Sequence, residues 1–185
     1  MSLYNPDTVK IAQHEFKVLY DEKAIYTRLD ELAKQIKEEY CDKKPVLLGV
    51  LNGAFVFLSD LAKRLDFDCE IHFVKLSSYG DEMESSGVVR DVIGLELDIT
   101  DRHILIVEDI VDTGRSLTHM LQGLSSKKPA SLNIATFLHK PEATIFPLDI
   151  KYVGFRIPNQ FVLGYGLDYA QYGRNLAQLY VLKED

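Results

Sequence analysis

Apolar residues along the chain follow two patterns that alternate. Residues 46–51 (VLLGVL), 104–107 (ILIV) and 131–138 (SLNIATFL) form mainly apolar runs, which are typical of strands buried on both faces. Residues 22–40 and 115–125 instead carry apolar side chains at helical spacing, with polar residues between them. Strands and helices that alternate in this way predict an α/β fold with a central, mostly parallel sheet flanked by helices.

The segments around these elements complete the predicted core. Residues 54–65 predict a further helix, while residues 16–20, 67–76 and 91–97 predict strands. Residues 77–88 (SSYGDEMESSGV) are rich in serine, glycine and acids and predict a long loop. Such a loop is either a lid over a binding site or the tip of a hairpin between its flanking strands.

The carboxyl-terminal part of the chain has a different character, because helical spacing fades after residue 143. Residues 152–156, 161–164 and 179–182 predict short strands separated by glycine and proline, in a segment rich in aromatic side chains. We expect this segment to form a small hood over the ligand crevice. The prediction is a single domain, residues 1–185, with its core at about residues 20–140 and a hood formed by the N-terminal segment and residues 141–185.

Composition and charge narrow the class of protein. The chain has 185 residues, a net charge of −7 and a pI near 5.2, so we expect no broad surface for nucleic acid or anionic membranes. Its two cysteines, Cys41 and Cys69, lie far apart in the sequence and are expected to be free thiols in a reducing compartment. Neither a secretion signal nor an apolar stretch of membrane-spanning length is evident. We therefore expect a soluble, cytoplasmic protein.

The densest candidate chemistry lies in residues 104–117, ILIVEDIVDTGRSL. A strand predicted at residues 104–108 ends at two acids, Glu108 and Asp109, and the turn at residues 112–116 (DTGRS) leads into the next helix. Helix amino ends offer free N–H groups and a partial positive charge to phosphate, and Gly114 lets the backbone approach it. Acids suited to sugar hydroxyls or Mg²⁺, beside a phosphate cup, predict a sugar-phosphate site.

Two further candidates lie at the ends of two other predicted strands. The turn Asn52-Gly53 follows the first apolar run and could form a second anion cup, although a plain connection explains it about as well. Lys140 follows the strand at residues 131–138, where a role in the site and simple solvation are about equally good explanations. Because the carboxyl ends of parallel strands share one edge of a sheet, these candidates and the acids are expected to lie on the same edge.

The motif at residues 104–117 resembles the phosphoribosyl pyrophosphate (PRPP) signature of the type I phosphoribosyltransferases. Other stretches, in the same order along the chain, are similar to the hypoxanthine-guanine, or 6-oxopurine, branch of that family. They are LLGVLNGAFVFLSDL (47–61), SSYG (77–80), LHKP (138–141) and IPNQFVLGYGLDY (157–169), together with Arg174.

The resemblance implies the type I phosphoribosyltransferase fold and an enzyme of purine salvage. Such an enzyme uses Mg²⁺ to transfer the phosphoribosyl group of PRPP to N9 of hypoxanthine or guanine, with xanthine as a further candidate base. The products are IMP or GMP and pyrophosphate. The resemblance also favours a homodimer or a homotetramer.

The resemblance also assigns roles to residues of the core. Glu108 and Asp109 would engage the ribose hydroxyls and their Mg²⁺, and Asp112 would be the catalytic residue that accepts the purine N7 proton. The residues expected to bind PRPP are Glu108, Asp109, Asp112, Thr113, Gly114, Arg115, Ser116 and Leu117.

A second set of residues is assigned to the pyrophosphate by the same resemblance. In the family, the peptide that corresponds to Leu51–Asn52 is often cis, which the sequence alone does not establish here. Asn52 also stands where many relatives have lysine, so this loop lacks a cation. The residues expected at the pyrophosphate are Leu51, Asn52, Gly53, Ser78, Tyr79 and Arg174.

The purine and the metal complete the expected site. Lys140 would donate to the purine 6-oxygen, Phe161 would stack on the ring, and Asp168 would hold a second Mg²⁺. The residues expected around the purine are Ile110, Lys140, Phe161, Val162 and Asp168, and the expected metal ligands are Glu108, Asp109 and Asp168.

Alternative functions fit the sequence less well. A PRPP-sensing regulator with the same fold would carry a basic face or an added DNA-binding domain, or would lack the catalytic acid, whereas Asp112 is present. A generic nucleotide-binding protein is disfavoured because neither G-x-G-x-x-G nor G-x-x-x-x-G-K-[ST] occurs. An adenine or pyrimidine transferase is disfavoured by Lys140 and by the stretch at residues 157–169.

Overall fold

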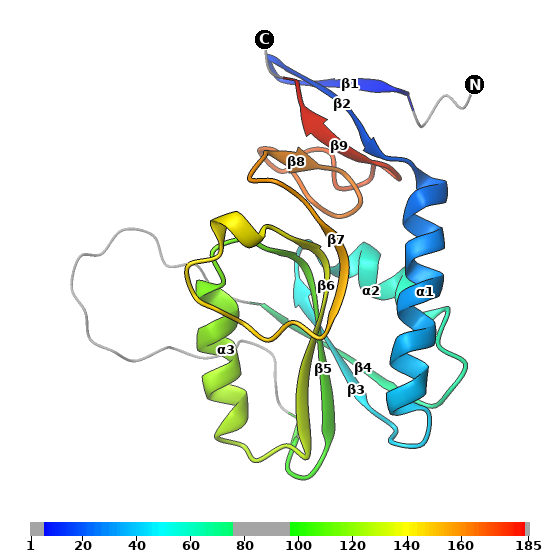
Figure 1. Ribbon diagram of the computed structural model, residues 1–185, viewed down its shortest axis with the longest axis vertical. Coiled ribbons are helices and arrows are strands. Elements are labelled where there is room, and N and C mark those ends of the chain that lie inside the picture. Colours follow the sequence, from blue (N-terminus) through cyan, green and yellow to red (C-terminus); the bar gives the residue numbers. More distant parts are fainter. Residues whose placement is uncertain (1–5, 76–96, 184–185) are drawn as a thin grey trace, which may run out of the picture.

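The structure is a computed structural model in which residues 6–75 and 97–183 are described. Within these residues the strands form two β-sheets, which are accompanied by three α-helices (Figure 1). The helices are α1 (Glu22–Tyr40), α2 (Phe55–Ala62) and α3 (Arg115–Ser125), and Pro141–Ala143 forms one 3-10 turn. The strands are β1 (Thr8–Ile11), β2 (His14–Tyr20), β3 (Val46–Leu51), β4 (Glu70–Lys75), β5 (His103–Val111), β6 (Ser131–His139), β7 (Tyr152–Arg156), β8 (Val162–Leu163) and β9 (Leu179–Leu182). The core sheet is parallel, in the order β4-β3-β5-β6-β7, and the hood sheet is antiparallel, in the order β1-β2-β9-β8.

The core sheet is buried on both faces, with α1 and α2 on one side and α3 on the other (Figure 1). Successive residues of a strand point to opposite faces of a sheet. In β3, Leu47 belongs to the cluster formed with α1 and α2, whereas Leu48 belongs to the cluster formed with α3. Leu105 and Ile106 of β5 divide in the same way. This alternation explains why the central strands are continuous apolar runs.

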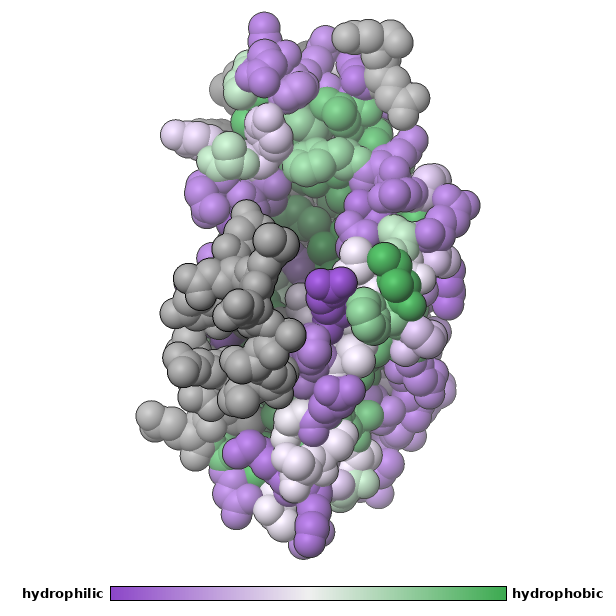
Figure 2. All heavy atoms as spheres, turned by 90° about the vertical axis from the view of Figure 1, so that its left-hand side faces the viewer, coloured by the Kyte–Doolittle hydropathy of each residue, from purple (hydrophilic) through white to green (hydrophobic). Residues whose placement is uncertain are grey.

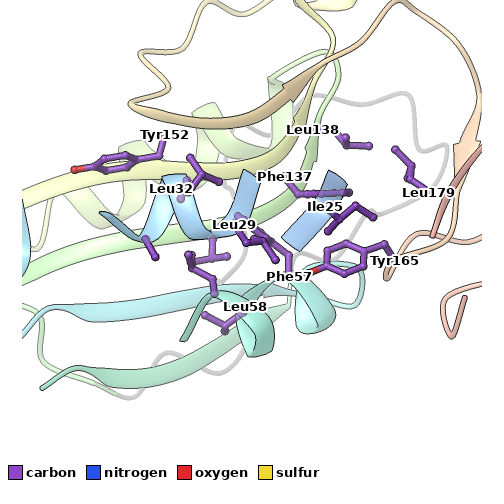
Figure 3. Close-up of a cluster of buried hydrophobic side chains, with 14 of the residues drawn as sticks. Ile25, Leu29, Leu32, Phe57, Leu58, Phe137, Leu138, Tyr152, Tyr165 and Leu179 are labelled. Atoms are coloured by element: carbon purple, nitrogen blue, oxygen red, sulfur yellow. The ribbon is translucent and has the colours of Figure 1, made fainter. Parts of the chain in front are cut away.

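The hood sheet rests on the same hydrophobic core. Phe16, Leu163 and Tyr180 form a small cluster within the hood. Tyr165 and Leu179 instead join the main cluster, where they lie near residues of α1, α2 and β6 (Figure 3). The hood is therefore anchored by side-chain burial as well as by chain connections.

Most predicted elements are confirmed. The helices at residues 22–40 and 115–125 and the strands at 46–51, 152–156 and 179–182 have the predicted bounds. The predicted α/β class, with a central parallel sheet flanked by helices, is also confirmed. In the described part of the chain, no helix combines the length and the apolar character needed to cross a membrane.

Some predicted bounds are wrong. The helix predicted at residues 54–65 ends at Ala62, because Arg64 and Leu65 bond back only three residues, in a tighter turn. The strand predicted at residues 67–76 is β4, which begins three residues later, at Glu70, and residue 76 lies outside the described residues. The strand predicted at residues 104–108 continues to Val111, because the parallel pairing with β6 continues past the two acids.

Other differences concern the placement of elements. β1 was not predicted, and among the described strands it is an edge strand that pairs with β2. β7 lies in the range expected for the hood, yet it pairs with β6 in the core sheet. The predicted loop at residues 77–88 and residues 91–96 of the predicted strand lie outside the described residues.

Candidate active site

The carboxyl ends of β3, β5 and β6 lie side by side at the edge of the core sheet nearest the hood (Figure 1). β5 pairs in parallel register with β3, Val107 opposite Gly49, and with β6, Val111 opposite His139. The two acids and the DTGRS turn were predicted from one stretch of sequence, and Lys140 was predicted from another. The parallel pairing brings them to one edge, as expected for ligand sites of open α/β sheets.

Glu108 and Asp109 form a buried acidic pair. Oε2 of Glu108 is buried and has no hydrogen-bond partner among the residues that the structure describes. Burial, and then the neighbouring Asp109 carboxyl, raise the pKa of Glu108 well above its ordinary value. Burial also raises the pKa of Asp109, although the Ile110 N–H and the charge of Arg174 oppose the rise. The two carboxyl groups therefore have few hydrogen-bond donors and little neighbouring positive charge. Sugar hydroxyls and a divalent cation can supply both.

The turn at the start of α3 has the backbone geometry expected of the predicted phosphate cup. Gly114 is the N-cap residue with φ 80° and has no side chain that could cap the free N–H groups at this helix end. The Arg115 N–H makes a long hydrogen bond to the Thr113 hydroxyl oxygen, at 3.4 Å. A Cβ atom at Gly114 would lie 2.5 Å from the Phe146 carbonyl oxygen, so this position needs glycine. A cavity of about 120 Å³ is lined by Glu108, Ile110, Val111, Asp112, Thr113, Gly114, Arg115, Ser116 and Leu117.

The segment 145–146 holds the cup in place. The N–H groups of Ile145 and Phe146 both donate to the Thr113 carbonyl oxygen, at 3.1 and 3.0 Å. The Arg115 guanidinium lies over the Phe146 ring, 5.5 Å from its centroid. Arg115 therefore also helps to attach this segment to the phosphate cup.

The loop after β3 contacts both the acidic pair and the hood. The Leu51–Asn52 peptide bond is cis, as it often is in the family that the sequence resembles. A Cβ atom at Gly53 would lie 1.5 Å from Oδ2 of Asp109, and one at Gly166 would lie 2.2 Å from the Gly53 carbonyl oxygen. Because Gly53 and Gly166 lack side chains, the loop after β3 can contact both Asp109 of β5 and the hood at Gly166.

Lys140 and Asp112 form an ion pair at the end of β5 and β6. Lys140 is only 7% exposed, and its Nζ lies 3.3 Å from Oδ2 of Asp112, whose side chain is half exposed. The Thr144 hydroxyl lies 3.0 Å from the Asp112 carbonyl oxygen and 2.9 Å from that of Lys140. Thr144 thus ties the two turns together. Sequence reasoning missed it, because a single threonine after a strand carries no pattern.

An apolar wall faces the site from the hood. Phe161 is 44% exposed and makes a tilted contact with Phe16 and an edge contact with Tyr169. Val162 is buried in β8, while Ile110 lies on β5 beside the acidic pair. Figure 2 shows the surface hollowed between hood and core, with hydrophobic side chains on the hood wall. An aromatic face at such a hollow suits a planar ring.

Asp168 and Arg174 meet in the hood. Arg174 Nη2 lies 2.6 Å from Oδ1 of Asp168, and Arg174 Nη1 donates to the Gly166 carbonyl oxygen at 2.9 Å. Oδ2 of Asp168 accepts the Gln171 N–H at 2.8 Å. The predicted pyrophosphate-binding arginine is therefore paired with a predicted metal ligand. Ser78 and Tyr79, predicted on the loop over the pyrophosphate, lie outside the described residues.

The acidic pair has the chemistry that Mg²⁺ prefers. Within residues 6–75 and 97–183, no three histidine, cysteine or acidic side chains are gathered as a metal cluster. Mg²⁺ is usually held by one or two carboxylates together with substrate phosphates. Two buried carboxyls, one with an unused oxygen, therefore fit a magnesium ion that arrives with a phosphorylated ligand.

Comparisons with known proteins agree with this geometry. Residues 16–170 match the family model described as "Phosphoribosyl transferase domain". The chain is 39% identical to the hypoxanthine-guanine phosphoribosyltransferase of Streptococcus mutans, covering 95% of this chain and 97% of that protein. It is 42% identical to the enzyme of the same name from Dictyostelium discoideum, covering 91% and 96%. The crystal structure of a hypoxanthine-guanine phosphoribosyltransferase from Bacillus anthracis superposes with a TM-score of 0.84 at 35% identity, covering 90% of this chain and 98% of that one.

The parallel core sheet with its flanking helices matches that fold, and the predicted family is confirmed. The chain belongs to the hypoxanthine-guanine phosphoribosyltransferases, transferases of purine salvage that use PRPP to convert hypoxanthine or guanine into nucleotides.

Proposed function

We propose that Lys140 and Asp112 are the base-recognition pair of this enzyme. The observation that carries the proposal is the 3.3 Å distance between Lys140 Nζ and Asp112 Oδ2, made by a lysine that is almost fully buried. A 6-oxopurine offers an acceptor, O6, next to N7, so a donor and an acceptor side by side match it. Buried charges are kept where a partner or a ligand satisfies them.

Lys140 explains the preference for 6-oxopurines. Its ammonium group donates to O6 of hypoxanthine, guanine or xanthine, whereas the 6-amino group of adenine would place donor against donor. Mismatched polar groups of this kind discriminate by up to about 10⁴-fold. The exposed Phe161 ring stacks on one face of the base and Ile110 packs on the other, while Val162 offers backbone groups to the base edge.

The PRPP lies along the edge of the core sheet. Its 5-phosphate occupies the cavity at the start of α3, where backbone N–H groups and the hydroxyls of Thr113 and Ser116 donate to it. Glu108 and Asp109 accept from the ribose hydroxyls. The pyrophosphate lies at the loop Leu51–Gly53 and Arg174.

Magnesium is the proposed cofactor. Glu108 and Asp109, through the ribose hydroxyls and the metal's hydration shell, and Asp168 would hold it. When bound, Mg²⁺ neutralises the charge that develops on the departing pyrophosphate. Asp168 is paired with Arg174 in the structure, so we propose that the two side chains part or share the ligand when it binds.

Asp112 moves the proton. Purine N9 attacks C1 of the ribose, the bond from C1 to the pyrophosphate oxygen breaks, and the N7 proton passes to the Asp112 carboxylate. In the reverse reaction the same group returns the proton. Arg174 donates to the pyrophosphate as a charge-assisted partner.

We also propose a homodimer or a homotetramer in the cytoplasm. Phe55 on α2 and Ile71 and Phe73 on β4 are large apolar side chains that are more than 40% exposed, a surface that oligomers commonly bury. The two cysteines are free thiols, which suits a reducing compartment. Light scattering coupled to size-exclusion chromatography measures the assembly directly.

An ultraviolet assay tests the proposed function. The protein is mixed with PRPP, with and without Mg²⁺, and separately with hypoxanthine, guanine, xanthine and adenine. We expect Mg²⁺-dependent conversion of 6-oxopurines and none of adenine. Conversion of adenine at a comparable rate would overturn the role of Lys140. Tight PRPP binding without conversion of any base would indicate a PRPP-sensing protein.

A further inference from the structure

Asp60 and Tyr165 connect α2 to the hood beside the proposed pyrophosphate site. Tyr165 is 1% exposed, and its hydroxyl donates to Oδ2 of Asp60 at 2.9 Å, across 105 residues of sequence. Figure 3 shows the Tyr165 ring among the buried side chains of α1 and α2. A buried hydroxyl bonded to a carboxylate is one of the stronger hydrogen bonds of a protein. Nothing in the reaction proposed above uses either side chain.

The backbone at Tyr165 is held in an unfavourable conformation. Its φ is 48°, in the left-handed region, which a bulky aromatic residue rarely adopts. Such a conformation persists only where the surroundings fix it. The burial of the ring and the bond to Asp60 supply that restraint, and they set the direction in which the chain enters Gly166.

Gly166, the residue after Tyr165, contacts both Arg174 and Gly53 of the proposed pyrophosphate site. Its carbonyl oxygen accepts from Arg174 Nη1 at 2.9 Å, and its N–H donates to the Arg174 carbonyl oxygen at 3.0 Å. Its Cα lies so close to the core that an added Cβ would be 2.2 Å from the Gly53 carbonyl oxygen. Gly53 in turn lies against Asp109. Both parts of the proposed pyrophosphate site, the Gly53 loop and the Arg174 guanidinium, therefore contact the residue that follows Tyr165.

We infer that Asp60 and Tyr165 are positioning residues, which set Arg174 and the Gly53 loop for the pyrophosphate of PRPP. This inference rests on the proposed role of those two groups. Neither positioning residue touches the substrate. Their loss should therefore weaken PRPP and pyrophosphate and leave the purine, which contacts Lys140 and Phe161, largely unaffected.

Steady-state kinetics of Tyr165→Phe test the inference, since this variant removes the hydroxyl and keeps the ring. We expect the KM values for PRPP and pyrophosphate to rise by about tenfold, the size of one lost charge-assisted hydrogen bond. We expect the KM for hypoxanthine to change by less than about twofold, as for a site that keeps its contacts. Asp60→Leu should reproduce this pattern, and Asp60→Asn, which keeps an acceptor oxygen, should restore nearly normal values.

Tyr180→Phe is the matched control. Tyr180 is another fully buried hood tyrosine, but its hydroxyl donates to the Pro6 carbonyl oxygen, away from Gly166. Removing this hydroxyl should lower stability and leave the KM values for PRPP, pyrophosphate and hypoxanthine unchanged. Amide hydrogen exchange adds a second readout, because the Gly166 N–H should exchange faster in Tyr165→Phe and not in Tyr180→Phe.

Arg174→Ala separates the inference from the function on which it rests. If Arg174→Ala weakens PRPP but Tyr165→Phe does not, the positioning role is overturned and the proposed site stands. If Arg174→Ala leaves PRPP unaffected, the proposed pyrophosphate site itself is wrong. Equal rises in the KM values for PRPP and hypoxanthine in Tyr165→Phe would also overturn the inference, since they indicate a general loss of structure.

Discussion

Glu108 at the edge of the core sheet and Asp168 in the hood are both expected to act on the same ligand, yet their surroundings differ. Glu108 has a buried oxygen without a partner among the described residues, and its pKa is raised by burial and by Asp109. Both oxygens of Asp168 are engaged, one by Arg174 at 2.6 Å and the other by the Gln171 N–H at 2.8 Å. The core edge thus holds an acid that lacks a partner for one oxygen, while the hood holds an acid whose charge is already compensated.

This difference indicates two ways of preparing a binding site. The acids of the core are consecutive residues of a strand whose pairing with β6 continues past them, so the backbone holds them together and they depend on a ligand for compensation. In the hood, Arg174 and Asp168 satisfy each other until a ligand replaces one partner. Binding should therefore add positive charge at the core edge and exchange partners in the hood.

The largest expected effect comes from Asp112→Asn, which tests whether the core edge performs the chemistry. An amide cannot accept the N7 proton, and loss of a general base commonly lowers turnover by about 100-fold to 10,000-fold. PRPP binding measured by calorimetry should be largely retained. Asp66→Asn is the control, since Asp66 is an exposed acid paired with Lys37 at 2.5 Å, remote from the site. Unchanged turnover in Asp112→Asn would refute the catalytic role.

The second-largest loss of turnover is expected from Gly53→Ala. This variant tests the contact between the loop after β3 and the acidic pair, Glu108 and Asp109. The new methyl group would overlap Oδ2 of Asp109 at 1.5 Å, so Asp109 must move. Misplacement of one group by about 1 Å can lower turnover by about 100-fold. Gly123→Ala is the control, because nothing lies within 4 Å of its added Cβ. It should leave activity unchanged and stabilise α3 by up to about 1 kcal/mol. Equal activity of the two variants would contradict the account.

Lys140→Ala tests whether the purine and PRPP are bound by separate groups of residues. It removes the donor to O6, and loss of a hydrogen bond from a charged group should weaken purine binding by between about tenfold and hundredfold. Binding of PRPP alone should change far less. Lys183→Ala, which removes an exposed hood lysine paired with Glu15, is the control for the lost charge. Equal losses of purine and PRPP affinity in calorimetry would count against this assignment.

The core could be predicted from the sequence further than the hood could. The bounds of α1, α3 and β3 are encoded locally, because each is a run of one periodicity closed by polar residues. β1 has only four residues and depends on pairing with β2, so no local pattern marks it. The position of β7 at the edge of the core sheet depends on its pairing with β6, which the local sequence of β7 does not specify.

The candidate site likewise contains residues that could be predicted from local sequence and residues that could not. The pattern of residues 104–117 alone indicated the acids and the phosphate cup, because strand end, acids, glycine and helix start are adjacent in sequence. Arg174, Asp168 and Phe161 could be assigned only by the family resemblance. Neither route found the bond between Asp60 and Tyr165, which joins distant residues and leaves no periodic signal.

Thermal unfolding of Glu108→Gln across pH tests the central claim most directly, that Glu108 at the core edge lacks a partner until the ligand binds. The unfolded chain loses the Glu108 proton at about pH 4.3, the ordinary pKa of glutamate. The folded protein keeps the proton to higher pH, because the pKa is raised. Between these two values the native state binds more protons, so the free energy of unfolding of the wild type falls as pH rises.

Glutamine removes this pH-dependent loss. At pH 7 we expect Glu108→Gln to have a higher Tm than the wild type without ligand, and the difference should shrink as pH falls toward the unfolded pKa. With Mg²⁺ and PRPP the order should reverse, because ligand stabilises the wild type more. A ligand-free Glu108→Gln that is less stable than the wild type at pH 7, or an equal stabilisation of both proteins by Mg²⁺ and PRPP, would contradict the account.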